Sequence, residues 1–208
     1  KPKKPQEYGL NNIQELMIPT SDGLNLLSWY SQPKNNQPLL VYFHGNSFDI
    51  GERAYRILRY IKEDWGVLIF AWRGFSGNKG KPSEIKLYED AESVLKWINN
   101  NTSIKKSNIV IYGESLGTGV AVEIGTRYSF KSIILEAPFT SIPDVAQKKY
   151  KIYPTKYLVL DKFENFLKIN KVLSPILIVS GKKDEIIPHE HSLKLFEKAN
   201  IPKDCLFI

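Results

Sequence analysis

Hydrophobic residues along the chain form short apolar runs that alternate with longer amphipathic stretches. Each of the five central runs is about five residues long and almost wholly apolar, which is typical of strands buried on both faces of a sheet. Between them, apolar residues recur every three to four positions, as they do on one face of a helix. Strands are predicted at Leu39–Phe43, Val67–Ala71, Asn108–Tyr112, Ser132–Glu136 and Ile176–Ser180, and helices at Gly51–Glu63, Ser83–Trp97, Leu116–Tyr128 and Glu190–Lys198.

The two ends of the chain add further strands. Ile13–Ile18 and Leu24–Tyr30 flank the turn sequence Thr20-Ser21-Asp22-Gly23, which predicts a hairpin. Cys205–Ile208 is interpreted as the beginning of one more strand, cut off midway. Because the strands alternate with helices long enough to act as crossovers, the sequence predicts a single α/β domain over residues 1–208. Its mostly parallel central sheet would be flanked by helices.

Composition narrows the class of partner. The chain has 208 residues, 42% of them hydrophobic, and a formal net charge of +7. Its lysines are spread along the chain and no nucleic-acid motif is present, so a nucleic-acid partner is not expected. Attraction to anionic lipid, as a peripheral membrane association, stays open. No apolar run approaches the roughly 20 residues of a membrane span.

Two further features bear on where the protein resides. Cys205 is the only cysteine, which excludes an intrachain disulfide and fits a reducing compartment. The chain begins at Lys1 rather than Met, so we expect an N-terminal segment to be missing. Together these features predict a cytoplasmic or membrane-associated protein.

The pentapeptide Gly113-Glu114-Ser115-Leu116-Gly117 follows a predicted strand and opens a predicted helix. It fits G-x-S-x-G, the nucleophile elbow of one large class of hydrolases. Glycines at both flanks allow a sharp turn, and the helix beginning at Leu116 points backbone N–H groups at developing negative charge. Ser115 is therefore the predicted nucleophile, ahead of Thr118 inside the helix. The alternative is a plain glycine-rich turn.

Two more loops follow predicted buried strands, where parallel sheets place their active sites. In His44-Gly45-Asn46-Ser47, the backbone of Asn46 or Ser47 would supply a second oxyanion donor beside the Leu116 N–H. In the loop Gly181–Glu185, Asp184 is the predicted acid that orients a histidine, with Glu185 as the fallback. The alternatives are an ordinary loop and a solvated turn aspartate.

A serine nucleophile needs a histidine to take its proton. His44 belongs to the predicted oxyanion loop, whereas His189 and His191 follow Asp184 by only five and seven residues. That spacing allows His189 or His191 to contact Asp184, but we do not expect either to reach Ser115 as well. We therefore expect the catalytic histidine to lie beyond Ile208, together with the rest of a truncated last strand and a final helix.

The remaining motifs do not suggest a cofactor. No cluster of His, Cys and Asp has metal-ligand spacing. The glycine-rich stretch Arg73–Gly80 lacks the G-x-x-x-x-G-K-[ST] pattern and is interpreted as a loop beside the active site. Residues 137–171 are irregular and form a candidate lid. Its aromatic residues line an apolar acyl site or belong to the core: Phe139, Tyr150, Tyr153, Tyr157, Phe163 and Phe166.

In combination these motifs resemble the α/β-hydrolase superfamily, and specifically the Bem46-like group, which includes the depalmitoylating α/β-hydrolase-domain proteins. The resemblance runs from about residue 13 to the end of the chain. It rests on Phe43–Asn46, Arg73–Gly77, Gly80–Glu84, Ile111–Thr118, Ala137–Ser141 and Gly181–Pro188.

The resemblance implies an α/β-hydrolase fold with Ser115 as nucleophile and Asp184 as triad acid. It also implies backbone donors at Leu116 and in the Asn46/Ser47 loop. The substrate would be a small or lipid-like acyl ester or thioester, cleaved through an acyl-enzyme without a cofactor. The alternatives are a serine peptidase of the same fold and a noncatalytic binding module on a hydrolase scaffold.

Overall fold

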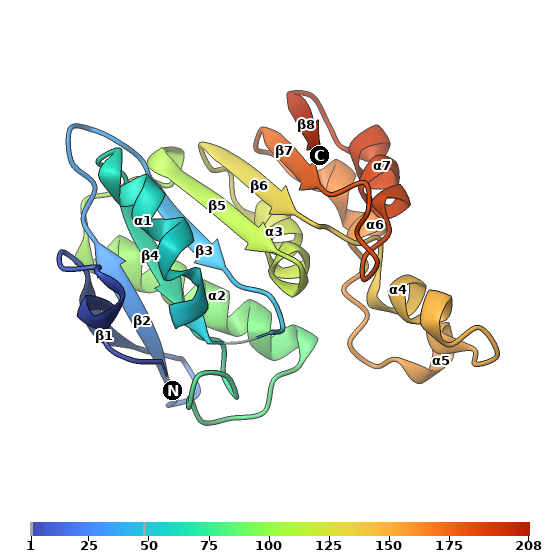
Figure 1. Cartoon of the computed structure of the whole chain (residues 1–208), viewed down its shortest axis with the longest axis horizontal. Coiled ribbons are helices and arrows are strands. Elements are labelled where there is room, and N and C mark those ends of the chain that lie inside the picture. Colours follow the sequence, from blue (N-terminus) through green and yellow to red (C-terminus); the bar gives the residue numbers. More distant parts are fainter. Residues whose placement is uncertain (1, 48) are drawn as a thin grey trace.

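Eight strands form one sheet in the order β1-β2-β4-β3-β5-β6-β7-β8 (Figure 1). The computed structural model describes residues 2–47 and 49–208. The β1–β2 and β2–β4 pairs are antiparallel and all the others are parallel, which confirms the predicted mostly parallel sheet. The strands are β1 Gln14–Pro19, β2 Asn25–Ser31, β3 Leu39–Phe43, β4 Gly66–Phe70, β5 Ile109–Glu114, β6 Ser132–Glu136, β7 Ile176–Ser180 and β8 Lys203–Phe207.

Helices cover both faces of this sheet. Alternate strand residues point to opposite faces, so Val41 packs in the core beneath α2 and α3, whereas Tyr42 packs in the core beneath α1. Within the part of the chain that the structure describes, no helix has the length and apolar character needed to cross a membrane. The α-helices are α1 Ala54–Lys62, α2 Glu84–Asn101, α3 Leu116–Arg127, α4 Ile142–Lys149, α5 Thr155–Leu158, α6 Asn165–Lys168 and α7 His189–Lys198; the 3₁₀ helices are η1 Pro5–Tyr8, η2 Ile50–Arg53, η3 Lys106–Asn108 and η4 Ile169–Lys171.

Several segments differ in detail from the sequence prediction. The helix expected from Gly51 begins as η2, where the Asp49 side chain caps the Gly51 N–H at 2.8 Å, and becomes α-helical only at Ala54. Residues 137–171, expected to be irregular, contain α4, α5 and α6. β8 begins at Lys203, two residues earlier than predicted, and pairs with β7 along all five of its residues.

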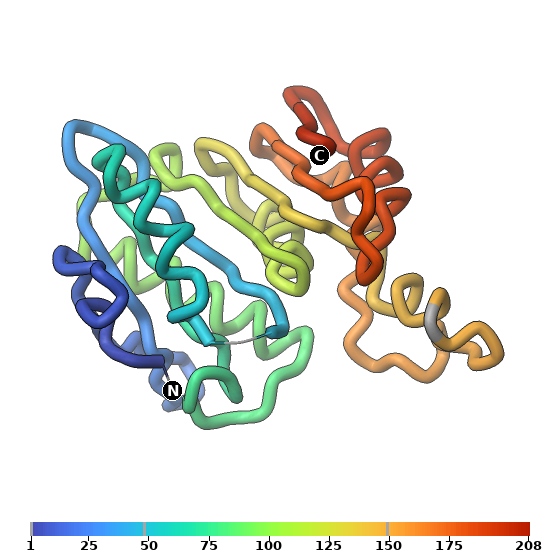
Figure 2. The backbone as a smooth tube through the Cα atoms, in the orientation of Figure 1, coloured from blue at the N-terminus to red at the C-terminus, as the bar shows by residue number. Residues whose placement is uncertain are grey.

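At the centre of the sheet, successive strands are added on opposite sides of β3. β4 pairs with one edge of β3 and β5 with the other, so the loops that follow β3 and β5 diverge at their carboxyl ends. Such a switch point forms the crevice in which open α/β sheets bind their ligands. Figure 2 also shows that, after β6, the chain forms an α4–α5 segment that projects beyond the carboxyl ends of the parallel strands. The topology therefore brings the Asn46 and Ser115 loops to one crevice.

Candidate active site

Ser115 occupies a tight turn between β5 and α3. Its backbone has a φ of 51° and a ψ of −115°, a region that costs a non-glycine residue about 1–3 kcal/mol. Neighbouring backbone holds this conformation. The Ser115 N–H donates to the Glu136 carbonyl at 2.9 Å, and the Thr118 N–H donates to the Ser115 carbonyl at 2.9 Å. A strained serine at the head of a helix is the geometry of a nucleophile elbow.

Glycine is required where the elbow approaches its neighbours. A Cβ atom on Gly117 would overlap the carbonyl oxygen of Phe43, so only glycine allows α3 to pack against the end of β3. A Cβ on Gly45 would lie 3.3 Å from the Ser115 Cβ. The loop after β3 is therefore in contact with the turn that carries Ser115.

Arg53 links this loop to the elbow. Its Nε and Nη2 atoms donate to the two carboxylate oxygens of Glu114 at 3.0 and 2.8 Å, while Nη1 donates to the Ser47 carbonyl at 2.7 Å. The Tyr42 hydroxyl also donates to Glu114 at 2.8 Å. Burial alone raises the pKa of Glu114, but the hydrogen bonds from Arg53 outweigh it and hold the pKa below its usual range. Glu114 is therefore an anion that Arg53 ties to the Asn46 loop.

A second arginine forms a similar ion pair with the glutamate that ends the neighbouring strand, β6. Arg56 pairs with Glu136, which also accepts a hydrogen bond from the Tyr112 hydroxyl at 2.7 Å. The Tyr112 ring stacks on the Tyr42 ring with centroids 4.7 Å apart. Sequence reasoning missed both arginine clamps. The available signal was that two successive, largely apolar strands, β5 and β6, each end in a glutamate, Glu114 and Glu136.

A cleft of about 650 Å³ opens beside the elbow and is lined by Ser115, Asp184, Asn46 and Leu116. The structure therefore brings all four predicted site residues to one cavity. Leu116 is the first residue of α3, and the first N–H groups of a helix have no acceptor inside it. Much of the rest of the lining is apolar: Phe75, Pro82, Leu87, Phe139, Ile142, Val145, Phe163, Ile186 and Ile187.

Asp184 lies in the turn after β7 with its carboxylate held in place. One oxygen accepts hydrogen bonds from the backbone N–H groups of Ile186 and Ile187, at 2.8 and 2.9 Å. The other oxygen has no part in these two bonds, and the side chain is only half-buried. The carboxylate is thus oriented by its own loop beside the cleft.

The three histidines have other partners. His44 is fully buried; its Nδ1 lies 2.7 Å from the Gly45 carbonyl, and its Nε2 accepts the Trp72 N–H at 3.3 Å. His189 bonds to the Ser180 hydroxyl and His191 to the Thr140 hydroxyl, both at 2.8 Å. Across residues 2–47 and 49–208, no histidine is hydrogen-bonded to Ser115 or Asp184.

The aromatic residues of the segment 137–171 divide between different environments. Phe139 and Phe163 are buried and line the cleft beside Ser115. Tyr153 and Tyr157 are exposed. Phe166 lines a separate cavity between α4 and α7. The sequence offered two alternatives for these aromatic residues, an acyl site or the core. Phe139 and Phe163 fit both, whereas the exposed tyrosines and Phe166 fit neither.

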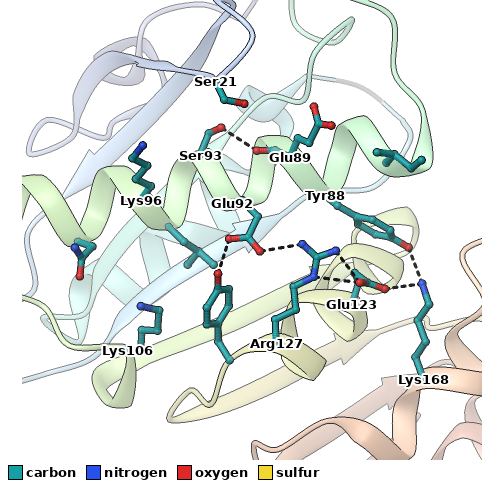
Figure 3. Close-up of a pocket in the computed structure, with 14 residues that line it drawn as sticks. Ser21, Tyr88, Glu89, Glu92, Ser93, Lys96, Lys106, Glu123, Arg127 and Lys168 are labelled. Carbon is teal, nitrogen blue, oxygen red and sulfur yellow. Dashed lines mark hydrogen bonds and ion pairs between the residues drawn. The ribbon is translucent and has the colours of Figure 1, made fainter.

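A second hollow, of about 750 Å³, lies between α2 and α3 and contains none of the predicted site residues (Figure 3). Arg127 pairs there with Glu92 at 3.0 Å and Glu123 at 2.7 Å, and Lys168 pairs with Glu123 at 2.6 Å. These ion pairs neutralise the charges of the four side chains and link α2, α3 and α6 to one another. Among the described residues, no group of three or more His, Cys, Asp or Glu is placed to hold a metal ion.

The fold and the elbow geometry define an α/β hydrolase. Solved structures share this fold: the esterase Pf2001 of Pyrococcus furiosus has a TM-score of 0.80 at 18% identity, covering 100% of this chain and 86% of that one. The α/β hydrolase GrgF of a Penicillium species has a TM-score of 0.75 at 16% identity, covering 94% and 89%. At these identities the likeness shows the fold.

Sequence comparisons define the family. The sequence model of the prolyl oligopeptidase family matches residues 79–204. Human alpha/beta hydrolase domain-containing protein 17B is 32% identical over 198 residues, which are 94% of this chain and 67% of that protein. An uncharacterised Mycobacterium tuberculosis protein is 31% identical over 192 residues, 91% of this chain and 68% of that protein. The chain belongs to the prolyl oligopeptidase family of the α/β-hydrolase superfamily.

Proposed function

We propose that the protein is a serine hydrolase that cleaves an acyl ester or thioester through an acyl-enzyme on Ser115. The observation that carries this proposal is the strained backbone of Ser115 at the head of α3, opening on a cleft with apolar walls. Membership of a hydrolase superfamily supports the reaction class. The apolar lining supports an acyl group as the part of the substrate that is bound.

In the proposed reaction, the Ser115 hydroxyl oxygen attacks the acyl carbonyl carbon and loses its proton to a histidine. The tetrahedral oxyanion receives hydrogen bonds from the backbone N–H groups of Asn46 and Leu116. Collapse of this intermediate expels the alcohol or thiol, which takes the proton from the histidine. Water then attacks the acyl-enzyme, and the carboxylic acid leaves Ser115 free again.

Asp184 would orient that histidine and stabilise its protonated form. Because His44, His189 and His191 are all engaged elsewhere, we propose that the base lies outside residues 1–208. We further propose that residues 137–171 form a lid, since Ile142 and Val145 of α4 wall the cleft on that side. On the resemblance of its motifs, we place the chain in the Bem46-like group, where thioester cleavage would be depalmitoylation.

The substrate class is tested by turnover of the natural gene product on three matched series: acyl esters, acyl thioesters and aminoacyl amides. The proposal predicts hydrolysis of esters or thioesters that increases with acyl length and is abolished in Ser115→Ala. Preference for the amides would favour the peptidase suggested by the family's name. A bound ligand without turnover of any series would identify a noncatalytic binding module.

A further inference from the structure

The segment that follows α4 exposes large apolar side chains. We define the cap tip as Lys151–Leu160, which includes α5 and projects beyond the end of the sheet (Figure 1). Within it, Ile152 is 94% exposed, Leu160 91% and Tyr157 83%. Apolar side chains concentrated in this way on a protein surface mark a site of interaction.

The surroundings of the cap tip are basic. Residues 145–160 contain four lysines and no aspartate or glutamate. An adjoining cavity of about 850 Å³ between α4 and α7 has four lysines in its wall, beside the acids Asp144 and Glu197. None of the ion pairs within the described part of the chain involves those lysines. They are Lys148, Lys151, Lys194 and Lys198.

We propose that the cap tip docks on the surface of an anionic lipid bilayer. Ile152, Tyr157 and Leu160 would enter the interface, and the surrounding lysines would lie against the headgroup phosphates. Aromatic and aliphatic side chains flanked by lysine are the combination that binds such an interface. A second copy of the chain is a poor partner because its cap tip has the same positive charge. A nucleic acid would stack on tyrosines but would leave the aliphatic side chains in water.

The cap tip also borders the candidate active site. Ile142 and Val145 of α4 line the cleft, whereas Lys148, near the end of the same helix, lines the basic cavity. Asp161, the next residue after the cap tip, lines the cleft as well. Docking would therefore bring the mouth of the cleft to the lipid surface, where an acyl chain enters without crossing water. This consequence rests on the proposed function.

The test is flotation of the chain with phosphatidylcholine vesicles, with and without phosphatidylserine. We expect stronger binding to the phosphatidylserine vesicles that declines as salt is added. Ile152→Ser and Leu160→Ser should each lower the partition coefficient roughly tenfold. Lys151→Gln and Lys156→Gln should each lower it about fivefold.

Matched controls lie away from the cap tip. Ile201 is 87% exposed, and Ile201→Ser should bind vesicles as the native chain does. Lys131 is exposed before β6, and Lys131→Gln should behave likewise. Equal losses in these controls and in the cap-tip variants would overturn the proposal, as would native binding that ignores phosphatidylserine or is absent.

Two other outcomes would also overturn it: cap-tip variants that lose single-stranded nucleic acid binding but keep vesicle binding, or that change only the oligomeric state. Vesicle binding needs no turnover, so Ser115→Ala should float like the native chain. A failure to bind vesicles by a protein that hydrolyses esters would remove only the docking proposal. Binding without hydrolysis would remove only the proposed function.

Discussion

Replacing Arg53 by methionine tests whether the Arg53–Glu114 pair holds the predicted oxyanion loop against the elbow. The Arg53 side chain is 6% exposed and that of Glu114 is 19% exposed. The substitution removes two hydrogen bonds to Glu114, at 3.0 and 2.8 Å, and one each to the carbonyls of Ser47 and Asp49, at 2.7 and 3.3 Å. Glu114 then remains an anion, and among residues 2–47 and 49–208 its one remaining side-chain donor is the Tyr42 hydroxyl.

Removing one partner of a buried ion pair costs 3–5 kcal/mol. Because Glu114 keeps some access to water and one hydrogen bond, we expect the free energy of unfolding to fall by about 3 kcal/mol. The double variant Arg53→Met/Glu114→Gln removes the unpaired charge and should recover at least about 1 kcal/mol of that loss. Arg59→Met is the control, since Arg59 is exposed on α1, the helix that follows Arg53, and should change stability by less than about 0.5 kcal/mol.

The measurements are urea unfolding of each variant and ester hydrolysis by the natural gene product. Loss of one oxyanion donor lowers kcat by about 10²–10³-fold, so a loosened Asn46 loop should lower it by roughly 10–100-fold with little change in KM. The reasoning is refuted if Arg53→Met unfolds like Arg59→Met, or if the double variant is less stable than the single one.

Three further predictions concern the same region. Asp184→Asn should lower kcat by about 10³–10⁴-fold in steady-state ester hydrolysis, because the histidine loses its orienting anion; unchanged kcat would remove Asp184 from the triad. Gly117→Ala should lower the free energy of unfolding in urea by at least about 1–3 kcal/mol, because its Cβ overlaps the Phe43 carbonyl; native stability would contradict that packing. Burial lowers the pKa of His44 from 6.5 to about 4, so between these values the unfolded chain binds a proton that the folded chain does not. Stability should therefore fall as pH drops through 6.5 and level off below about 4, by about 3 kcal/mol in total, and urea titrations of His44→Gln should lack this slope.

The strands of the parallel sheet were predictable because burial on both faces leaves wholly apolar runs. β3, β6 and β7 begin and end where the sequence predicted. β5 runs two residues further than expected, to Glu114, because Glu114 still pairs with Glu136 in β6. The motif therefore overlaps the strand, and local hydrophobicity could not show where pairing ends.

The part of the candidate site that lies in loops after buried strands was predictable, because parallel sheets place their active sites there. Ser115, Leu116, Asn46 and Asp184 line one cleft as the topology implied; their chemical roles stay predictions. Contacts between distant segments were not predictable. Arg53 and Glu114 are separated by 61 residues, and Arg53 fits an ordinary helical pattern.

The claim that Ser115 is the nucleophile is tested most directly by labelling the natural gene product with a fluorophosphonate, followed by mass spectrometry of the modified peptide. The account predicts one phosphonylated residue, Ser115, and no labelling of the Ser115→Ala variant. Labelling that survives Ser115→Ala, or no labelling of a folded protein that hydrolyses esters, would contradict it.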